Sequence, residues 1–361
     1  MGGIHLTQNE QVILYHLVAY PDASDREISQ KVRLGISTVT KIRNRLLREG
    51  YLTAVNIPDV QKIGAEIMTI GYGEFNPNIP IDQKLERSQE WIDKITGTFL
   101  TIGDGNQAIG MGFYRNYTAG MESILMTKRL IGTEPMMTSG DINSLFISFG
   151  VAKFYRFFNY APLLAKTLGI RDTDYSEPNF YMENTGDSHL TRKEKLVLYG
   201  LIKYPDHNDK NLGALLGISR QTISSVRKRF GRDGIITRRY IPNLVKLGFE
   251  VVVFAHIQMK NDVQMDPESL REALTEDNTI TSICHGTDIV SISAFSNFAD
   301  TKDRISTFLK DQKGQGLFTK EPIVYLWSAN DLIYQISHDY HIPLSRILGI
   351  DPTSVPQPQD L

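Results

Sequence analysis

The sequence of 361 residues contains one cysteine, two tryptophans and almost no net charge. Its single cysteine, Cys284, excludes internal disulfides and thiolate-rich metal sites. With a formal net charge of -2, any attraction to nucleic acid must come from local basic patches, because the average field supplies none. No apolar run approaches the roughly 18 residues of a membrane span, and the first residues lack a signal-peptide pattern. These absences predict a soluble cytoplasmic protein.

Signatures of catalysis are also scarce. The sequence has no phosphate-binding glycine loop of the Walker or Rossmann kind, and no serine–histidine–aspartate order or metal-spaced histidine pair. The glycines of "GDGNQAIGMG" stand at a strand–strand turn, where glycine supplies positive φ. We therefore expect that the chain is not an enzyme and holds neither a cofactor nor a metal.

What the sequence does contain is an internal repeat. The segment "LTQNEQVILYHLVAYPDASD" from Leu6 matches "LTRKEKLVLYGLIKYPDHND" from Leu190, and the match continues without a gap to Gly64 and Gly248. Later segments also correspond, so each half repeats the other. Each half predicts a winged helix-turn-helix followed by a ferredoxin-like βαββαβ (RAM-like) domain, an α+β fold with two repeats. The predicted domains are a winged helix-turn-helix at 1–65, a βαββαβ domain at 66–170, a linker at 171–187, a second winged helix-turn-helix at 188–249, a second βαββαβ domain at 250–350 and a tail at 351–361.

The third helix of the second winged helix-turn-helix is predicted to read DNA. It begins after Ser219, a good N-cap residue, and its apolar stripe at Ile223, Val226 and Phe230 leaves a polar face outward. Hydroxyls, an amide and cations suit base edges and phosphates in the major groove. After a turn at Gly234, two short β segments are expected to form a wing with arginines at its tip. The predicted DNA contacts are Arg220, Gln221, Thr222, Ser224, Ser225, Lys228, Arg232, Arg238 and Arg239. The alternative is a solvated cationic helix face.

The first half keeps this pattern in a weaker form. Aligning its Gly-Ile-Ser with Gly217 to Ser219 needs an offset of 182, whereas the flanks require 184 (190 minus 6). In the flank register Arg33 replaces Gly217 and Gly35 replaces Ser219, while the apolar stripe is kept. Both wing arginines are lost, which predicts weaker DNA binding or another partner. The predicted outward face consists of Ser37, Thr38, Lys41, Asn44 and Arg48.

The way in which the two domains join resembles the Lrp/AsnC family of transcription regulators, of the archaeal type and tandemly duplicated. "NIPDVQKIG" and "YIPNLVKLGFE" lead from each winged helix into the first strand, and "HGTDIVSISAF" from His285 is similar to the family's Gly-x-Asp turn and following strand. The resemblance implies that the βαββαβ domains pair subunits and bind small effectors. The effector residues it implies are His285, Gly286 and Asp288, with Asp104 and Asn106 in the first half. There Gln107 stands in place of Asp288.

Together these observations predict a sequence-specific transcription regulator of double-stranded DNA, with a small-molecule effector as a further expectation. The chain would act as a homodimer or as an intramolecular pseudo-dimer. Two alternatives stay open: a tetrapyrrole-binding or decarboxylating enzyme derived from the same architecture, and a protein-interaction module. The aromatic run from Phe146 to Tyr160 is either core and interface packing or the lining of a ligand site.

Overall fold

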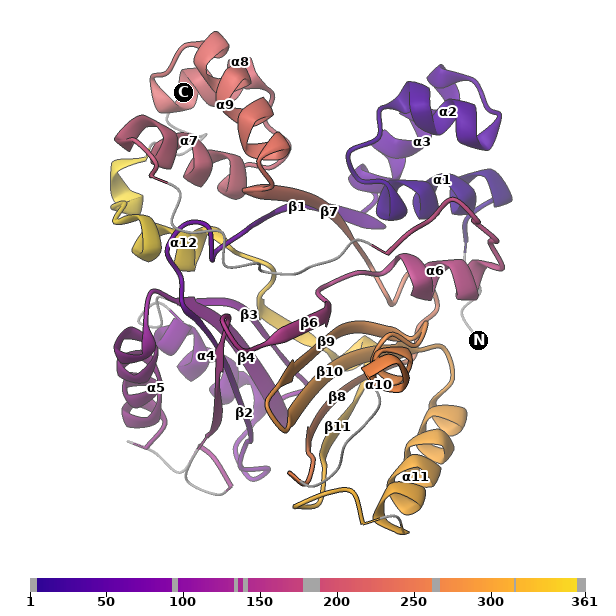
Figure 1. The fold of residues 1–361 in the computed structure, drawn as a ribbon, viewed down its shortest axis with the longest axis vertical. Helices are drawn as coiled ribbons and strands as arrows, with labels where there is room; N and C mark the ends of the chain where they lie inside the picture. Colours follow the sequence, from indigo (N-terminus) through magenta and orange to yellow (C-terminus); the bar gives the residue numbers. More distant parts are fainter. Residues whose placement is uncertain are drawn as a thin grey trace. The chain divides into compact units, whose positions relative to one another are not determined.

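The computed structural model describes residues 5–92, 97–132, 136–138, 142–177, 189–261, 267–314 and 316–355 (Figure 1). It has the α+β fold with two repeats that the sequence predicts. The chain divides into two compact units that do not follow chain order. Unit 1 consists of Met1–Ala54, Ala152–Tyr181 and Arg238–Asp331, and unit 2 of Val55–Val151, Met182–Thr237 and Leu332–Leu361. Each unit therefore combines the helix-turn-helix of one half with the sheet of the other.

The two helix-turn-helix modules have helices of equal length at equivalent positions. In unit 1 they are α1 (Gln8–Ala19), α2 (Asp25–Val32) and α3 (Ile36–Arg48); in unit 2 they are α7 (Arg192–Lys203), α8 (Asp209–Leu216) and α9 (Arg220–Arg232). Thr7 and Thr191 close capping boxes at the first helix of each module.

The C-caps of α2 and α8 settle the register between the halves. They are Arg33 (φ 56°) and Gly217 (φ 64°), both in the left-handed region, and the following N-caps are Gly35 and Ser219. The offset of 184 is thus confirmed, and a non-glycine residue occupies the strained position in the first half.

Each unit contains a five-stranded antiparallel sheet. In unit 1 the strand order is β11-β8-β10-β9-β6, and in unit 2 it is β12-β3-β4-β2-β5. The strands of unit 1 are β6 (Lys153–Arg156), β8 (Val251–Gln258), β9 (Thr279–His285), β10 (Asp288–Phe295) and β11 (Ile323–Ser328), with helices α10 (Pro267–Leu274) and α11 (Phe298–Gly314). Those of unit 2 are β2 (Ile67–Glu74), β3 (Thr98–Gly103), β4 (Gln107–Tyr114), β5 (Asn143–Ser148) and β12 (Ile333–Ile336), with helices α4 (Ile81–Ile92) and α5 (Tyr117–Gly132).

The fifth strand of each sheet is contributed by the other half of the chain, a feature that the sequence did not predict. β6 pairs with β9 and continues into α6 (Ala161–Leu168), which packs on α1 in unit 1. β12 pairs with β3 and continues into α12 (His341–Leu348), which contacts β3, β4 and α7 in unit 2. We call these two strand–helix segments the exchanged arms. The short 3-10 helices Ala329–Asp331 and Pro352–Ser354 complete the described elements.

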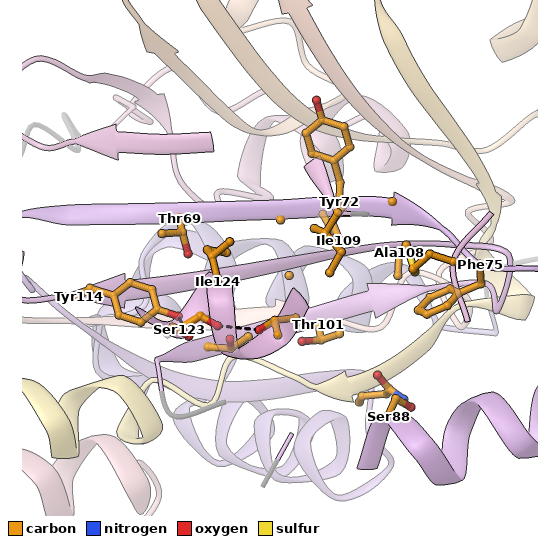
Figure 2. A pocket seen from close by; sticks show the side chains of 18 residues that line it. Thr69, Tyr72, Phe75, Ser88, Thr101, Ala108, Ile109, Tyr114, Ser123 and Ile124 are labelled. Atoms are coloured by element: carbon orange, nitrogen blue, oxygen red, sulfur yellow. Dashed lines mark hydrogen bonds between the residues drawn. The ribbon is translucent and has the colours of Figure 1, made fainter. Parts of the chain in front are cut away.

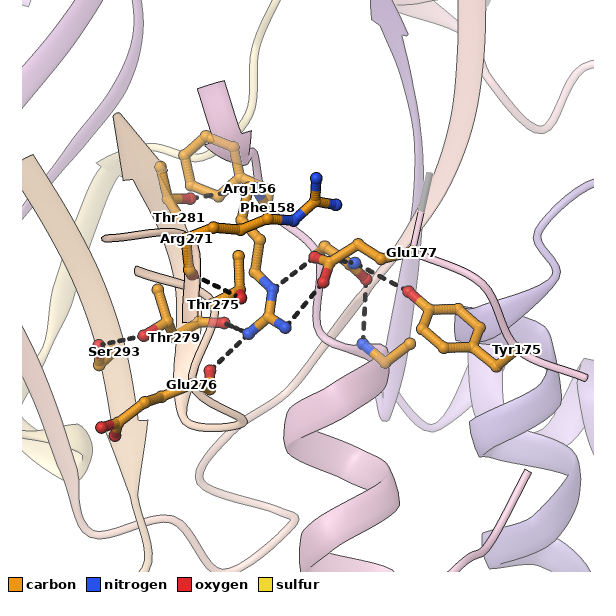
Figure 3. A network of polar contacts seen from close by, with 12 residues as sticks. Arg156, Phe158, Tyr175, Glu177, Arg271, Thr275, Glu276, Thr279, Thr281 and Ser293 are labelled. Atoms are coloured by element: carbon orange, nitrogen blue, oxygen red, sulfur yellow. Dashed lines mark hydrogen bonds and ion pairs between the residues drawn. The ribbon is translucent and has the colours of Figure 1, made fainter. Parts of the chain in front are cut away.

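A buried arginine holds the exchanged arm of unit 1. Arg156, 4% exposed, makes two charge-assisted hydrogen bonds to the carboxylate of Glu177. Its guanidinium also donates to the backbone carbonyls of Glu276 and Thr279 (Figure 3). Residues 171–177 of the predicted linker are therefore packed in unit 1, while its remaining residues, 178–187, lie outside the described part of the chain.

The wing differs from the prediction. β1 (Leu52–Pro58) and β7 (Ile236–Pro242) pair as a two-stranded ribbon, one strand from each half, rather than as a hairpin within each module. The Asn243 amide donates to the Tyr51 carbonyl (2.9 Å) in unit 1, and the Asp59 amide donates to the Ile235 carbonyl (2.8 Å) in unit 2. The turn at Gly234 (φ 64°) is present, but a single strand follows it.

The helical patterns of the sequence also predict helices over Pro267–Leu274 and Ala161–Leu168, and α10 and α6 have these bounds. A further helix is predicted over residues 82–95. Its last residues, 93–95, and the tail residues 356–361 lie outside the described ranges. The aromatic run is core: Phe149, Phe154, Phe157, Phe158 and Tyr160 are all buried. Within the described ranges, no helix has the length and apolarity to span a membrane, and no three His, Cys, Asp or Glu side chains cluster as metal ligands.

Candidate functional site

The outward face of α9 is polar and accessible. Ile223 and Phe230 are fully buried, which turns the opposite side of the helix to solvent. Arg220, Gln221, Ser225, Lys228 and Arg232 are exposed, while Thr222 and Ser224 are half-buried. The Thr222 amide donates to the hydroxyl of the N-cap residue Ser219 (3.2 Å), and the Thr222 hydroxyl lies 2.9 Å from the same oxygen. An exposed helix face of this composition can enter a major groove.

Two further arginines of α9 are held in ion pairs within the module. Arg227 Nε lies 2.8 Å from Asp209 Oδ1 at the start of α8, and its guanidinium also donates to the His207 carbonyl (2.8 Å). Arg229 Nη1 lies 2.6 Å from Glu194 Oε1 on α7. These pairs fix α9 against α7 and α8. On the exposed face, Arg232 Nε lies 2.9 Å from Oδ1 of the neighbouring Asp233, an ion pair that is open to solvent.

The same fixing pairs recur in the first half. Arg43 Nε lies 2.9 Å from Asp25 Oδ1, and Arg45 pairs with Glu10. With α3 held in this way, Ser37, Thr38, Lys41, Asn44 and Arg48 are all exposed. The predicted outward face of α3 is therefore accessible, with two cations against three on α9 (Lys41 and Arg48; Arg220, Lys228 and Arg232).

The wing arginines lie elsewhere than expected. Arg238 and Arg239 stand in the middle of β7 and not at the tip of a hairpin, because the wing ribbon pairs β7 with β1. Arg239 is 8% exposed, and the Arg238 guanidinium lies 5.3 Å from the centre of the Tyr240 ring. The structure thus removes the physical reason for expecting both side chains to reach DNA.

The predicted effector residues lie in the two β-hairpin turns of the sheets. Gly286 (φ 61°) forms the turn between β9 and β10, next to half-buried His285. In unit 2, Asp104 Oδ1 accepts the amides of Asn106 (2.9 Å) and Gln107 (2.8 Å), so this carboxylate stabilises its own turn. Beside the turn of unit 1, burial raises the pKa of the Cys284 thiol, which disfavours a reactive thiolate.

Unit 1 contains a histidine–carboxylate pair that the sequence patterns did not predict. His256 Nε2 lies 2.8 Å from Asp288 Oδ1, and Gln258 donates to the same oxygen at 3.4 Å. Because Asp288 stands opposite Gln258 in the β8–β10 register, His256 lies one step along the same face of the sheet. Aligning β8 with β10 at this register would have predicted the contact between His256 and Asp288.

Comparison with known proteins gives likenesses of fold. No model of a known protein family matches the chain, and no curated protein matches it in sequence. The crystal structure of the siroheme decarboxylase NirDL matches 95% of this chain and 99% of its own, with 11% identity and a TM-score of 0.48. The complex of NirDL with an iron-uroporphyrin III analogue covers the same shares, with 9% identity and a TM-score of 0.47. A transcriptional regulator from Neisseria meningitidis, solved with L-Met, matches 39% of this chain and 89% of its own, with 17% identity and a TM-score of 0.30.

One expectation is corrected by this comparison. We expected from missing motifs that the chain is not an enzyme. A decarboxylase matches 95% of the chain, so the absence of motifs that belong to other folds does not exclude catalysis, and the expectation is wrong.

Proposed function

We propose that the chain is a sequence-specific transcription regulator of double-stranded DNA, with α9 as its principal reading helix and α3 as a weaker one. The observation that carries the proposal is the exposed polar face of α9, on which Gln221, Ser225, Lys228 and Arg232 stand free of the core. Gln and Ser suit base edges, while Lys and Arg suit guanine or phosphate.

Two features of the module support this function. Arg227 and Arg229 are used to fix α9, so its exposed side chains are presented on a rigid scaffold. The exchanged arms tie each module to the sheet of the other half, which supports an intramolecular pseudo-dimer. An origin of the archaeal type, effector binding at the two hairpin turns, and contacts to DNA from Arg238 and Arg239 stay predictions.

The test is a DNA-binding titration across a salt series. With genomic fragments selected by the natural chain, Lys228→Ala is expected to weaken binding and to lower the salt slope by about one, because one phosphate or base contact is lost. Lys302→Ala, an exposed lysine of α11 in the other unit, is the matched control and should change neither value. Unchanged affinity and slope for Lys228→Ala would contradict the assignment of α9.

A second candidate function is the binding or decarboxylation of a tetrapyrrole, the activity named for NirDL. The observation that favours it is the His256–Asp288 pair. Loss of carbon dioxide leaves a carbanion that must be protonated, and a histidine held by a carboxylate is a suitable general acid. In this candidate function, His256 would deliver the proton.

This candidate is tested by adding siroheme to the purified chain and following visible absorption and released carbon dioxide. A decarboxylase would release carbon dioxide, and His256→Gln would stop the release while His5→Gln, a change at an exposed histidine before α1, would not. A chain that neither shifts the siroheme spectrum nor releases carbon dioxide would exclude this function and leave the DNA titration to decide the first.

A further inference from the structure

A cavity of about 130 Å³ lies in unit 2 between the sheet and its two helices (Figure 2). It is lined by Thr69 and Gly71 of β2, Thr101 of β3, Gly110 of β4 and Ser123 of α5, among others. The helix-covered face of a ferredoxin-like sheet is ordinarily filled with large apolar side chains. Here small and hydroxylated residues leave it open.

At two of the glycine positions, neither the backbone conformation nor the surrounding space requires glycine. Gly71 and Gly110 stand opposite one another in the middle of paired strands, and neither has a positive φ. A Cβ at Gly71 would meet its nearest atom, on Ile142, at 3.5 Å, and a Cβ at Gly110 would meet Thr101 at 3.8 Å, both ordinary contacts. Glycine within a strand is destabilising, and it often marks a place where a ligand approaches the backbone.

One end of the cavity is a cluster of hydroxyls. The Tyr114 hydroxyl donates to Ser123 Oγ (2.8 Å), and Thr69 and Thr98 also hydrogen-bond to it. Tyr114 is 7% exposed, and burial raises its pKa, so its ring carries a neutral hydroxyl. This end can donate to or accept from an uncharged polar group.

A buried cation lies next to the other end of the cavity. Lys84 and Ser88 form the inward face of α4 and are 5% and 6% exposed. Lys84 lines an adjoining cavity of about 30 Å³, which shares Ser88, Thr101 and other residues with the larger one. Its Nζ donates to the Gly105 carbonyl (2.8 Å). Within the part of the chain that the structure describes, no carboxylate forms an ion pair with this ammonium. Burial lowers its pKa, and the more distant Asp104 carboxylate offsets only part of that effect. A buried ammonium is costly unless an anion accompanies it.

We propose that this cavity binds a small aliphatic carboxylic acid with an uncharged polar group at its far end, the size of 4-hydroxybutyrate. The carboxylate would lie at Lys84, the polar group at Tyr114 and Ser123, and the carbon chain against Gly71 and Gly110. The volume agrees, because the cavity and the adjoining one together amount to about 160 Å³ (130 and 30), and a protein cavity of about 150 Å³ holds benzene, a molecule of similar size. The inference rests on the proposed function and gives its effector a chemical class. Its test uses no DNA, so ligand binding and DNA binding can fail independently.

The test is calorimetric titration of the full chain with 4-hydroxybutyrate and with 4-hydroxybutanamide, its uncharged analogue. The acid is expected to bind at least about tenfold more tightly than the amide, because only the acid supplies a charge partner for Lys84. Lys84→Met should bring the two affinities to within about twofold and should not lower the melting temperature, since a buried charge is removed. Lys302→Met is the matched control and should leave the preference for the acid intact.

A second variant addresses the glycine face. Gly71→Ala has room for its methyl group and should fold, yet it should weaken both ligands several-fold by narrowing the cavity. The proposal is overturned if the natural chain binds neither compound, if it binds acid and amide equally, or if Lys84→Met keeps the preference for the acid.

Discussion

At one register position on the helix-covered face of its sheet, unit 1 has the pair Ile257 and Ile289, whereas unit 2 has Gly73 and Ala108. At the next position, Ala255 and Ser291 in unit 1 correspond to Gly71 and Gly110 in unit 2. The backbone pairing is the same, but unit 1 has two isoleucines where unit 2 has Gly73 and Ala108, which line its cavity. The two sheets therefore share a strand register and differ in the side chains that it places on this face.

The largest expected effect concerns the exchanged arms. In unit 1, Arg156 of β6 stands opposite Ser282 of β9. At the equivalent place in unit 2, Ile336 of β12 stands opposite Thr101 of β3, so the hydrogen-bonded arginine of one arm corresponds to an apolar residue in the other. Arg156→Ile should lower the free energy of unfolding by about 3 kcal/mol, because Glu177 and two backbone carbonyls lose their donor. Urea unfolding measures this. The control Arg304→Ile removes an exposed ion pair with Glu276 and should lower the free energy of unfolding by less than about 1 kcal/mol. Equal losses in the two variants would mean that the buried hydrogen bonds of Arg156 stabilise the fold no more than an exposed ion pair does.

A smaller effect concerns two residues with positive φ in the arms, Phe158 (φ 46°) and His338 (φ 58°). Burial lowers the pKa of His338 to about 3, so below its ordinary pKa of about 6.5 the unfolded chain binds a proton that the folded chain does not. Stability is therefore lost as the pH falls, by about 1.4 kcal/mol per unit and about 2 kcal/mol at pH 5.

The variant His338→Phe carries the residue of the other arm and should lose less stability between pH 7.5 and pH 5 than the natural chain. Urea titrations at the two pH values give the comparison. If the natural chain and the variant lost the same free energy, His338 would not be a buried neutral histidine.

The smallest effect concerns the glycine face. Gly71→Ala should raise the free energy of unfolding by about 0.5–1 kcal/mol, because glycine costs about that much in a strand and the methyl group has room. Gly105→Ala is the matched contrast: its φ of 84° and a Cβ position 2.0 Å from Ile81 Cδ1 predict a loss of stability. Thermal melts of both variants check the signs, and a destabilised Gly71→Ala would show that the open space is needed for folding.

The sequence predicted the elements well because the repeat supplied each of them twice. Ser219 and Phe230 set the register of α9, and the same spacing in the first half placed α3. The exchanged arms could not be foreseen, because β6 and β12 pair with strands far away in the chain and each is only four residues long. The pairing of β7 with β1 is also long-range, and it places Arg238 and Arg239 within a strand. The cavity was missed because Lys84 on an inward helix face becomes informative only when the sheet opposite it is known.

The proposed function makes α9 the stronger DNA-reading helix and α3 the weaker one, and one pair of variants tests this central claim most directly. Arg232 and Arg48 are the same residue at equivalent positions of α9 and α3, with side chains 75% and 76% exposed. In a titration of selected DNA across a salt series, Arg232→Ala should weaken binding clearly and lower the salt slope by about one, while Arg48→Ala should do so to a lesser extent. Equal losses, or a larger loss for Arg48→Ala, would contradict the account.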